Sequence, residues 1–253
     1  MPPKIIILAP RYSDDVNAMS YMAKQNAARN EDYPPEDHVE IVADVSCKGS
    51  LLPFCFNQLF ALALDEYDKG NVTRALMLHS DISAPFGFAN ALYRVMRERG
   101  DVVVSAVVPI KEHGRTRTST AVGVRWNHFG FRRLINTSDR AGMPETFSTV
   151  DVARDVDEVL LINTGLWLAD LSHPAWDELH FEFKDRIRKN PETGSREALV
   201  SSKDWEMARF LDRKGMPYSA HWLPGVLHFG HDYWTPDEMP PVYPKFVANG
   251  ETS

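Results

Sequence analysis

The chain has 253 residues, of which 43% are hydrophobic and 25% are charged, a composition typical of a globular protein. Its formal net charge of −7 excludes a protein that coats nucleic acid through overall charge alone. The sequence has only two cysteines and no run of about 20 apolar residues, so we expect no disulfide framework, no cysteine-rich zinc site, no membrane span and a reducing, cytoplasmic compartment.

Strands and helices alternate over the first half of the sequence. Short apolar runs, typical of strands buried on both faces, occupy residues 4–9, 38–43, 74–82 and 101–108. Helix-compatible segments lie between them, at residues 14–29, 54–67 and 85–99. Gly100 follows the last of these as its predicted C-cap residue. This alternation predicts an α/β fold with a mostly parallel sheet and flanking helices.

The second half is less regular. Its predicted elements are two short strands and one helix, at residues 121–125, 158–162 and 201–214. A cationic cluster precedes the helix and consists of Lys184, Arg186, Arg188 and Lys189. We interpret this cluster as a solvated helix end, with a local basic groove as the alternative. We expect one domain over residues 1–233 and a proline-rich tail over residues 234–253.

The apolar run at residues 74–82 stops on His79, Ser80 and Asp81. In open α/β sheets, ligands bind at the carboxyl ends of the strands. Because His79 and Asp81 are two residues apart, an extended strand end would project both side chains the same way. An imidazole and a carboxylate there could bind a divalent cation, which in turn could bind a diphosphate. The alternative interpretation is a turn with a solvated carboxylate.

Two later segments complete a pattern that Asp81 begins. Lys203, Asp204 and Trp205 open the predicted helix, and residues 228–230 read His-Phe-Gly shortly after it. In this order the three segments resemble the GT-A glycosyltransferases, in particular the inverting enzymes of glycosyltransferase family 2. Those enzymes carry a DxD-type motif, then an acidic–Asp pair at a helix start, then a His-x-Gly. This sequence departs from them at His79 and Lys203, where acidic residues are usual.

The resemblance implies a GT-A (Rossmann-like) sheet with an irregular C-terminal part that binds the acceptor. It also implies transfer of a sugar from a nucleotide-sugar donor, most simply a UDP-sugar, with inversion, assisted by Mn²⁺ or Mg²⁺. Asp81 would bind the metal directly, with His228 as a second ligand and His79 as a direct or water-mediated one. Asp204 resembles the base that deprotonates the acceptor, and its alternative role is that of a helix-capping acid. The helix N-terminus and Lys203 should lower the pKa of Asp204.

The resemblance and the chemistry of the nearby turns together suggest binding residues around this centre. The donor side comprises Pro10, Arg11, Tyr12, Asp44, Lys48, Asn57, Ser80 and Lys111. The acceptor side comprises Gly165, within the small-residue turn at 163–167, and the stacking platforms Trp167 and Trp205. For Arg11 and Lys48 the alternative is an ordinary exposed charge, and for the two tryptophans it is a place in the core.

The acceptor is the least defined part of the prediction. Residues 50–57, 78–82 and 107–121 resemble small glycosyltransferases of bacteriophages, some of which modify hydroxymethylated bases in DNA. The acceptor could thus be DNA, or a saccharide, lipid-linked or protein hydroxyl. Two other functions remain open, namely a metallohydrolase built from His79, Asp81, His228 and His231, and a module that binds a sugar or nucleotide without turnover.

Overall fold

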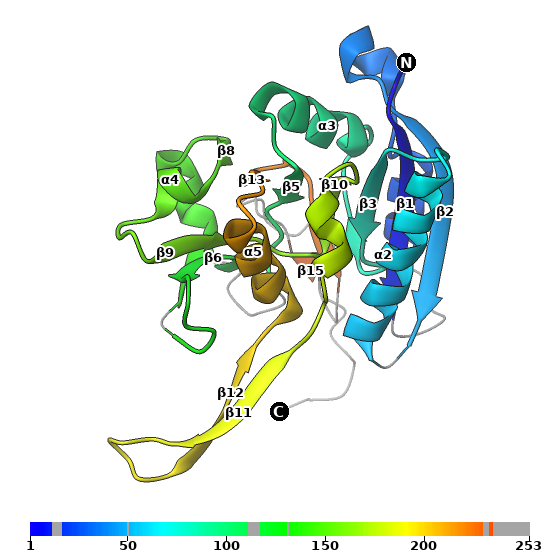
Figure 1. The fold of residues 1–253 in the computed structure, drawn as a ribbon. Coiled ribbons are helices and arrows are strands. Elements are labelled where there is room, and N and C mark those ends of the chain that lie inside the picture. Colours follow the sequence, from blue (N-terminus) through cyan, green and yellow to red (C-terminus); the bar gives the residue numbers. More distant parts are fainter. Residues whose placement is uncertain (12–16, 50, 111–116, 131, 230–232, 235–253) are drawn as a thin grey trace, which may run out of the picture.

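A seven-stranded sheet runs through the centre of the molecule (Figure 1), in the order β2-β1-β3-β10-β5-β13-β8. The computed structural model describes the whole chain except residues 12–16, 50, 111–116, 131, 230–232 and 235–253. The central strands are β1 (Lys4–Arg11), β2 (Glu40–Lys48), β3 (Arg74–Leu78), β5 (Val103–Ala106), β8 (Thr146–Phe147), β10 (Leu166–Asp170) and β13 (Tyr218–His221). Only β8 and β10 run against the other five, so the sheet is mostly parallel, as predicted.

Helices pack on both faces of this sheet. They are α1 (Ala18–Gln25), α2 (Leu52–Asp68), α3 (Phe88–Arg99), α4 (Thr149–Val152) and α5 (Lys203–Arg213). Short 3₁₀ turns are η1 (Asn30–Asp32), η2 (Pro35–Asp37), η3 (Thr137–Gly142) and η4 (Pro174–Glu178). Because side chains alternate along a strand, Ile6 and Leu8 of β1 enter the core that α2 and α5 cover. Ile5 and Ile7 enter the core beneath α1 and α3.

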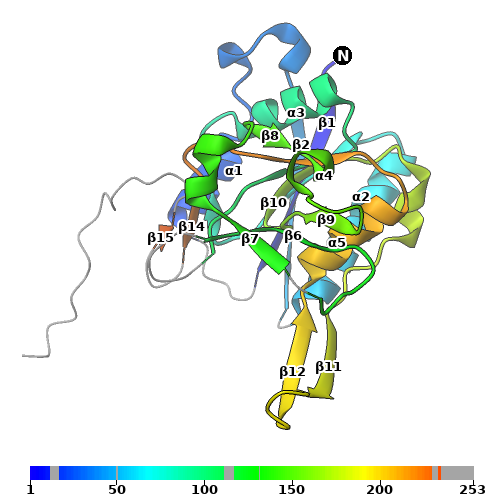
Figure 2. The ribbon, with the colours of Figure 1, turned by 90° about the vertical axis from the view of Figure 1, so that its left-hand side faces the viewer.

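Three smaller sheets surround the central one. The first contains β6 (Arg117–Val124), β7 (Arg132–Asn136) and β9 (Glu158–Leu161). The second contains β4 (Ile82–Ser83), β14 (Leu227–Phe229) and β15 (Tyr233–Trp234). The third is a hairpin of β11 (Lys184–Lys189) and β12 (Arg196–Ser201), which projects away from the body of the molecule (Figures 1 and 2).

The structure confirms the α/β class and corrects several boundaries. The second strand spans Glu40–Lys48 instead of residues 38–43, so Asp44 lies inside it. Every second residue of this edge strand is exposed, and most residues at the exposed positions are polar. The apolar run by which the sequence predicts a strand therefore stops before the strand does. The cationic cluster at 184–189 lies on a strand of the hairpin and not at a helix end. Within the described part of the chain, no helix combines the length and apolarity that crossing a bilayer requires.

Trp167, predicted to be an acceptor platform, belongs to the core. It lies on β10, is 1% exposed, and packs against Phe60, Trp176 and Phe181 with ring centroids 5.8 to 6.5 Å apart. A side chain enclosed in this way cannot stack on a ligand. The prediction is therefore wrong. The sequence could not distinguish the two roles, because residues 163–167 read the same whether β10 lies in the middle of the sheet or at its edge.

Replacing Trp167 tests this assignment. We expect Trp167→Ala to lower the free energy of unfolding by about 3–5 kcal/mol, because it leaves a cavity among aromatic rings. Trp126→Ala is the matched control, since Trp126 is 64% exposed, and it should change stability by no more than about 0.5 kcal/mol. Urea denaturation of both variants measures the difference, and equal losses would contradict the core assignment.

Candidate functional site

The candidate site lies at the edge where the parallel strands of the central sheet end. β1 and β2 end side by side there, with Arg11 paired to Lys48. β10 runs in the opposite direction, so residues 163–165, which precede it, reach the same edge. The first residue of α5, Lys203, contacts Thr164 of this turn through a 3.1 Å hydrogen bond. Segments far apart in sequence thus meet at one edge.

Residues 79–82 form a turn rather than an extended strand end. β3 ends at Leu78, and the N–H of Ile82 donates to the carbonyl of His79 at 3.1 Å, the bond typical of a β-turn. The predicted extension of the strand is therefore wrong. The turn nevertheless brings the two expected side chains together, with His79 Nδ1 3.8 Å from Asp81 Oδ1. Ser80 lies between them in the turn.

Strand pairing outside the central sheet brings His228 to Asp81. β14 pairs with β4, which sets His228 opposite Ile82, and the N–H of Phe229 donates to the carbonyl of Asp81 at 2.7 Å. His228 Nε2 consequently lies 3.6 Å from Asp81 Oδ2. Its Nδ1 lies 2.7 Å from the carbonyl of Pro109. Because a carbonyl only accepts, Nδ1 is the donor in this contact, and Nε2 is the ring nitrogen that faces Asp81.

Burial keeps the His79 ring neutral. Desolvation, followed by the charge of Lys203, lowers the pKa of His79 to about 3. The ring lies edge-on to Phe56, with centroids 5.3 Å apart. Its Nε2 is buried and has no hydrogen-bond partner among the described residues. Neutral imidazole is the form in which histidine binds metal ions.

The donor set of His79, Asp81 and His228 fits a divalent cation in its chemistry. Nitrogen atoms of two imidazoles approach one carboxylate, a combination that suits Mn²⁺ better than Mg²⁺. Within the described ranges, no three His, Cys, Asp or Glu side chains are arranged to hold an ion by themselves. Divalent ions at phosphate sites commonly take one or two protein ligands and complete their shell with water and phosphate oxygens. The set is therefore compatible with a cation that binds together with a diphosphate.

Asp204 lies in the first turn of α5, as predicted, and is ionised. Burial raises its pKa, but the charge of Lys203 and hydrogen bonds from Lys203 and Thr164 outweigh burial and lower it below the ordinary value. Lys203 Nζ is 2.8 Å from Asp204 Oδ1, which also accepts a short hydrogen bond from Thr164 Oγ1. Oδ1 is thus held by Lys203 and Thr164.

Lys203 is itself almost fully buried. Besides Asp204 and Thr164, it contacts the face of Phe56, with Nζ 4.4 Å from the ring centroid. The same Phe56 ring forms a T-shaped pair with the His79 ring, so one aromatic side chain contacts both the cation and the imidazole. Lys203 stands where an acidic residue is usual in the resembling family. It therefore places a positive charge next to the candidate base, Asp204.

Two predicted donor-binding residues have structural partners instead. Asp44 forms an ion pair with Lys24, 2.6 Å from Nζ to Oδ2, within β2 and away from the strand's end. Asn57 exchanges two 2.9 Å hydrogen bonds with the backbone of Phe181. These contacts engage both side chains within the fold, and their role in donor binding stays a prediction. Sequence could not show this, because β2 continues beyond its apolar run and Phe181 is 124 residues from Asn57.

Of the other donor-side residues that the structure describes, Arg11 and Lys48 lie at the strand ends and Ser80 in the turn after β3, and their role stays a prediction. Pro10 is buried within β1, paired with Cys47. Arg11 is half-buried at the end of β1, and its Nε has no hydrogen-bond partner within the described part of the chain. Three residues lie outside the described residues: Tyr12, Lys111 and His231.

The two remaining acceptor-side residues are partly enclosed. Gly165 is buried, and a Cβ atom there would lie 2.5 Å from Ile82 Cδ1, so a larger residue would require the Ile82 side chain to shift. Trp205 is half-buried, with the guanidinium of Arg132 stacked 4.2 Å from its ring centroid. Its Nε1 donates to the carbonyl of Ser119 at 3.3 Å. Arg132 therefore covers ring surface that the predicted stacking would use.

Three groups that shape the site were not assigned to it from the sequence: the Phe56 ring, the Thr164 hydroxyl and the Pro109 carbonyl. Phe56 appeared only as an apolar position of a helix, and Thr164 only as a member of the small-residue turn. The Pro109 carbonyl carries no side-chain signal at all, since any residue offers one. His228 lies 119 residues further along the sequence, so its contact with this carbonyl depends on the tertiary fold.

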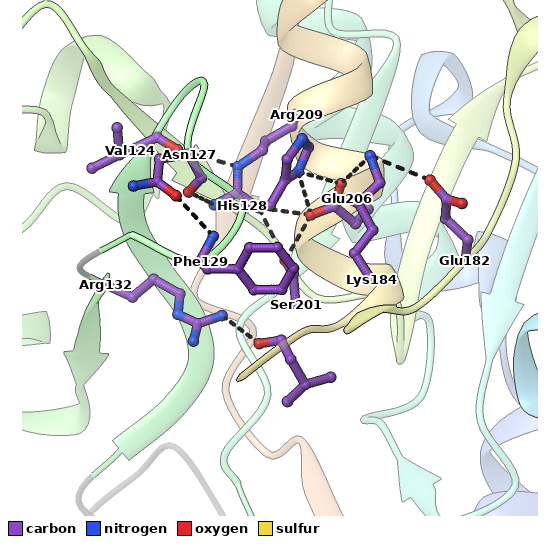
Figure 3. A network of polar contacts seen from close by, with 11 residues as sticks. Val124, Asn127, His128, Phe129, Arg132, Glu182, Lys184, Ser201, Glu206 and Arg209 are labelled. Carbon is purple, nitrogen blue, oxygen red and sulfur yellow. Dashed lines mark hydrogen bonds and ion pairs between the residues drawn. The ribbon is translucent and has the colours of Figure 1, made fainter. Parts of the chain in front are cut away.

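A buried charge network holds α5 and the root of the hairpin (Figure 3). Glu206 accepts hydrogen bonds from Ser201 Oγ at 2.6 Å and Arg209 Nη1 at 3.0 Å. His128 Nδ1 lies 2.6 Å and Lys184 Nζ 3.2 Å from its other oxygen. Arg209 also donates to the carbonyl of Val124, at 3.2 Å. The network ties α5 to β6 and to both strands of the hairpin, and so fixes the helix that carries Asp204.

Comparisons with known proteins give structural similarity only. No protein-family model matches the sequence, and no curated protein sequence matches it. The chain is similar to A197 from STIV, with 11% identity and a TM-score of 0.47 over 90% of this chain and 86% of that one.

Two enzymes of nucleotide-sugar metabolism are similar at a lower level. A mutant UDP-glucose pyrophosphorylase from Leishmania major, in complex with UDP-glucose, has 9% identity and a TM-score of 0.43, covering 87% of this chain and 62% of that one. CMP:2-keto-3-deoxy-manno-octonic acid synthetase in complex with CTP has 11% identity and a TM-score of 0.41, covering 87% and 89%. Similarity of this degree assigns neither a family nor an activity to the chain.

The buried network predicts a strong effect of neutralising Glu206. We expect Glu206→Gln to lower the free energy of unfolding by about 3–5 kcal/mol, because Arg209 would keep a buried charge without its counter-charge. Glu192→Gln, at an exposed position in the hairpin loop, is the control and should have little effect. Chemical denaturation measures both variants. A Glu206→Gln protein as stable as the control would show that the network does not stabilise α5.

Proposed function

We propose that this protein is a metal-dependent, inverting glycosyltransferase that moves a sugar from a nucleotide-sugar donor, most simply a UDP-sugar, to a hydroxyl acceptor. The observation that carries the proposal is the convergence of His79, Asp81, His228 and Asp204 at the carboxyl edge of a mostly parallel sheet. Ligands bind at this edge in open α/β sheets.

Cleavage of a nucleotide sugar requires that the departing diphosphate be neutralised. Asp81, His228 and His79 would hold the cation, which acts as a Lewis acid on the diphosphate. Arg11 and Lys48, side by side at the ends of β1 and β2, supply further positive charge at the same edge. Lys203 and Asp204 add an ion pair next to these groups, and the Phe56 ring contacts both Lys203 Nζ and the His79 ring.

Inverting transfer requires a base that accepts the proton of the acceptor hydroxyl. Asp204 would meet the requirement, because it is a carboxylate in the first turn of α5 that Lys203 and Thr164 fix at one oxygen, Oδ1. The same contacts keep the carboxylate ionised at neutral pH. A carboxylate with a lowered pKa is a weak base toward a free hydroxyl. We therefore expect the proton to move in the transition state, when the attacking hydroxyl has become more acidic.

Donor binding is tested by thermal melting with nucleoside diphosphates in the presence of Mn²⁺, Mg²⁺ or EDTA. A ligand at 100 times its Kd stabilises the fold by about 2.7 kcal/mol. We expect a Mn²⁺-dependent shift with UDP that Asp81→Asn loses, because the cation then lacks its carboxylate. Asp65→Asn is the matched control, since Asp65 is exposed on α2 and has no assigned role, and it should keep the shift. The absence of a shift with every nucleotide would reject the donor site.

Replacing Asp204 separates an enzyme from a binding module. We expect Asp204→Asn to reduce sugar transfer about 10²–10⁴-fold, the usual contribution of a general base, while the nucleotide-dependent melting shift remains. Asp68→Asn, at the exposed end of α2, should leave transfer unchanged. Transfer is measured to a panel of saccharides and to DNA that contains hydroxymethylated pyrimidines. An Asp204→Asn protein with full activity would exclude this residue as the base.

Lys203 should set the pH range of activity. In Lys203→Met the charge and hydrogen bond that lower the pKa of Asp204 are lost, and burial, which raises it, prevails. Because the ionised form of Asp204 is required, we expect the acid limb of the rate profile to move to higher pH. Lys69→Met, which removes an exposed partner of Glu66, is the control. Transfer rates between pH 4 and pH 8 measure the limb, and an unchanged limb would contradict the coupling.

A further inference from the structure

The two cysteines of the chain lie together where β2 ends and α2 begins. Cys47 is the penultimate residue of β2, and Cys55 lies in the first turn of α2. The helix packs along β1 and β2 (Figure 1), so the end of the strand meets the start of the helix. The sequence contains no other cysteine. Each thiol therefore has a single possible disulfide partner within the chain.

The contacts of both sulfur atoms bring the two thiols together. Cys47 Sγ donates to Gln58 Oε1 at 3.2 Å, and Gln58 lies one helical turn after Cys55. Cys55 Sγ lies so close to the strand end that a Cβ atom on Gly49 would be 2.8 Å from it. Each side chain thus points toward the element that carries the other, and the two thiols are hydrogen-bonded to each other.

The two thiols differ in their access to solvent. Cys47 is half-buried, whereas Cys55 is 0% exposed. Burial, followed by the adjacent Cys47 thiol, raises the pKa of Cys55 to about 11. An oxidant that arrives from solvent therefore meets Cys47 first, and Cys55 is the next group within reach. An accessible cysteine beside a second, resolving cysteine is a common arrangement of thiols that respond to oxidants.

Each cysteine directly precedes a residue at the edge that carries the candidate site. Lys48 follows Cys47 at the end of β2. Phe56 follows Cys55, and its ring contacts the His79 ring. A disulfide bond is about 2.05 Å long, shorter than any contact between unbonded sulfur atoms. Its formation must therefore draw the strand end and the helix start together, and Lys48 and Phe56 would move with them.

We propose that Cys47 and Cys55 form a redox pair that a hydroperoxide converts to a reversible disulfide, and that this disulfide weakens nucleotide binding at the neighbouring edge. Formation of the disulfide is independent of the proposed function, whereas its effect on nucleotide binding rests on that function. In a reducing compartment, which the sequence predicts, such a disulfide is transient.

The oxidation takes two steps. The Cys47 thiolate attacks one oxygen of the hydroperoxide, the O–O bond breaks, and the other oxygen leaves and takes up a proton. Cys55 sulfur then attacks the sulfenic sulfur of Cys47, and the displaced hydroxide leaves as water with the thiol proton. The two sulfur atoms together lose two electrons, which the peroxide gains. Because Cys55 is held in contact, the second step is intramolecular and outpaces reaction with a separate thiol. A dithiol reverses the bond by exchange.

Intact mass and thiol counting test the redox pair. After hydrogen peroxide is added to the full chain and removed, the monomer should have lost two hydrogen atoms and both titratable thiols, and dithiothreitol should restore them. In Cys55→Ala, Cys47 should instead stop at the sulfenic acid, which dimedone traps. In Cys47→Ala, the buried thiol of Cys55 should survive the same peroxide dose. The wild-type measurement needs no variant, so it decides the question even where a variant folds poorly.

Thermal melting of the reduced and oxidised wild type with UDP and Mn²⁺ tests the effect on the site. We expect the oxidised protein to require several-fold more UDP for the same shift, and dithiothreitol to reverse the change. Cys47→Ala, treated with peroxide in the same way, is the matched control for oxidation of methionines and should keep the shift.

A wild type that keeps both thiols, forms a disulfide between two chains, or ends as a sulfinic acid would reject the redox pair. An equal UDP requirement in the oxidised and reduced proteins would reject its effect on the site. A disulfide without any nucleotide-dependent shift in the reduced protein would uphold the redox pair and reject the proposed function. A shift in the reduced protein without disulfide formation would reject the redox pair alone.

Discussion

Strand β10 is the constraint on which the rest of the site depends. It pairs with β3 on one side and β5 on the other, and so joins the two halves of the central sheet. Because it runs against both, the turn before it reaches the edge where β3 ends. The carbonyl of Gly165 there accepts the N–H of His79 at 2.9 Å, and Thr164 donates to Asp204. A shift of β10 by one residue would displace both contacts and reverse its faces.

Helix α5 connects the reacting centre to the rest of the protein through buried charge. Lys203 and Asp204 pair at its first turn, and Glu206 and Arg209 pair one turn later. Charges removed from water are costly unless they are paired and hydrogen-bonded. Ser201 and His128 provide these additional bonds for Glu206. These pairs fix the orientation of the helix, and this orientation presents Asp204 to the sheet edge.

Local patterns in the sequence determined the elements and their order. Continuous apolar runs located β1, β3 and β5, and helical spacing located α2, α3 and α5 to within a few residues. Gly100, the predicted end of α3, adopts a φ of 69°, a conformation that favours glycine. The separation of His79 and Asp81 by one residue keeps them neighbours in a strand or in a turn. Asp204 at a helix N-terminus beside Lys203 was likewise a local inference.

Long-range pairing decided what local patterns could not. His228 reaches Asp81 only through the β4–β14 ladder, and Asn57 meets Phe181 only because the chain returns to α2. The cationic segment at 184–189 has too little apolar periodicity to reveal its pairing with β12. Trp167 became a core residue because β10 is central. The sequence by itself therefore determined the strands, the helices and the residue types of the site. Only the tertiary structure decided which of those residues meet, because strand neighbours and burial depend on contacts between distant segments.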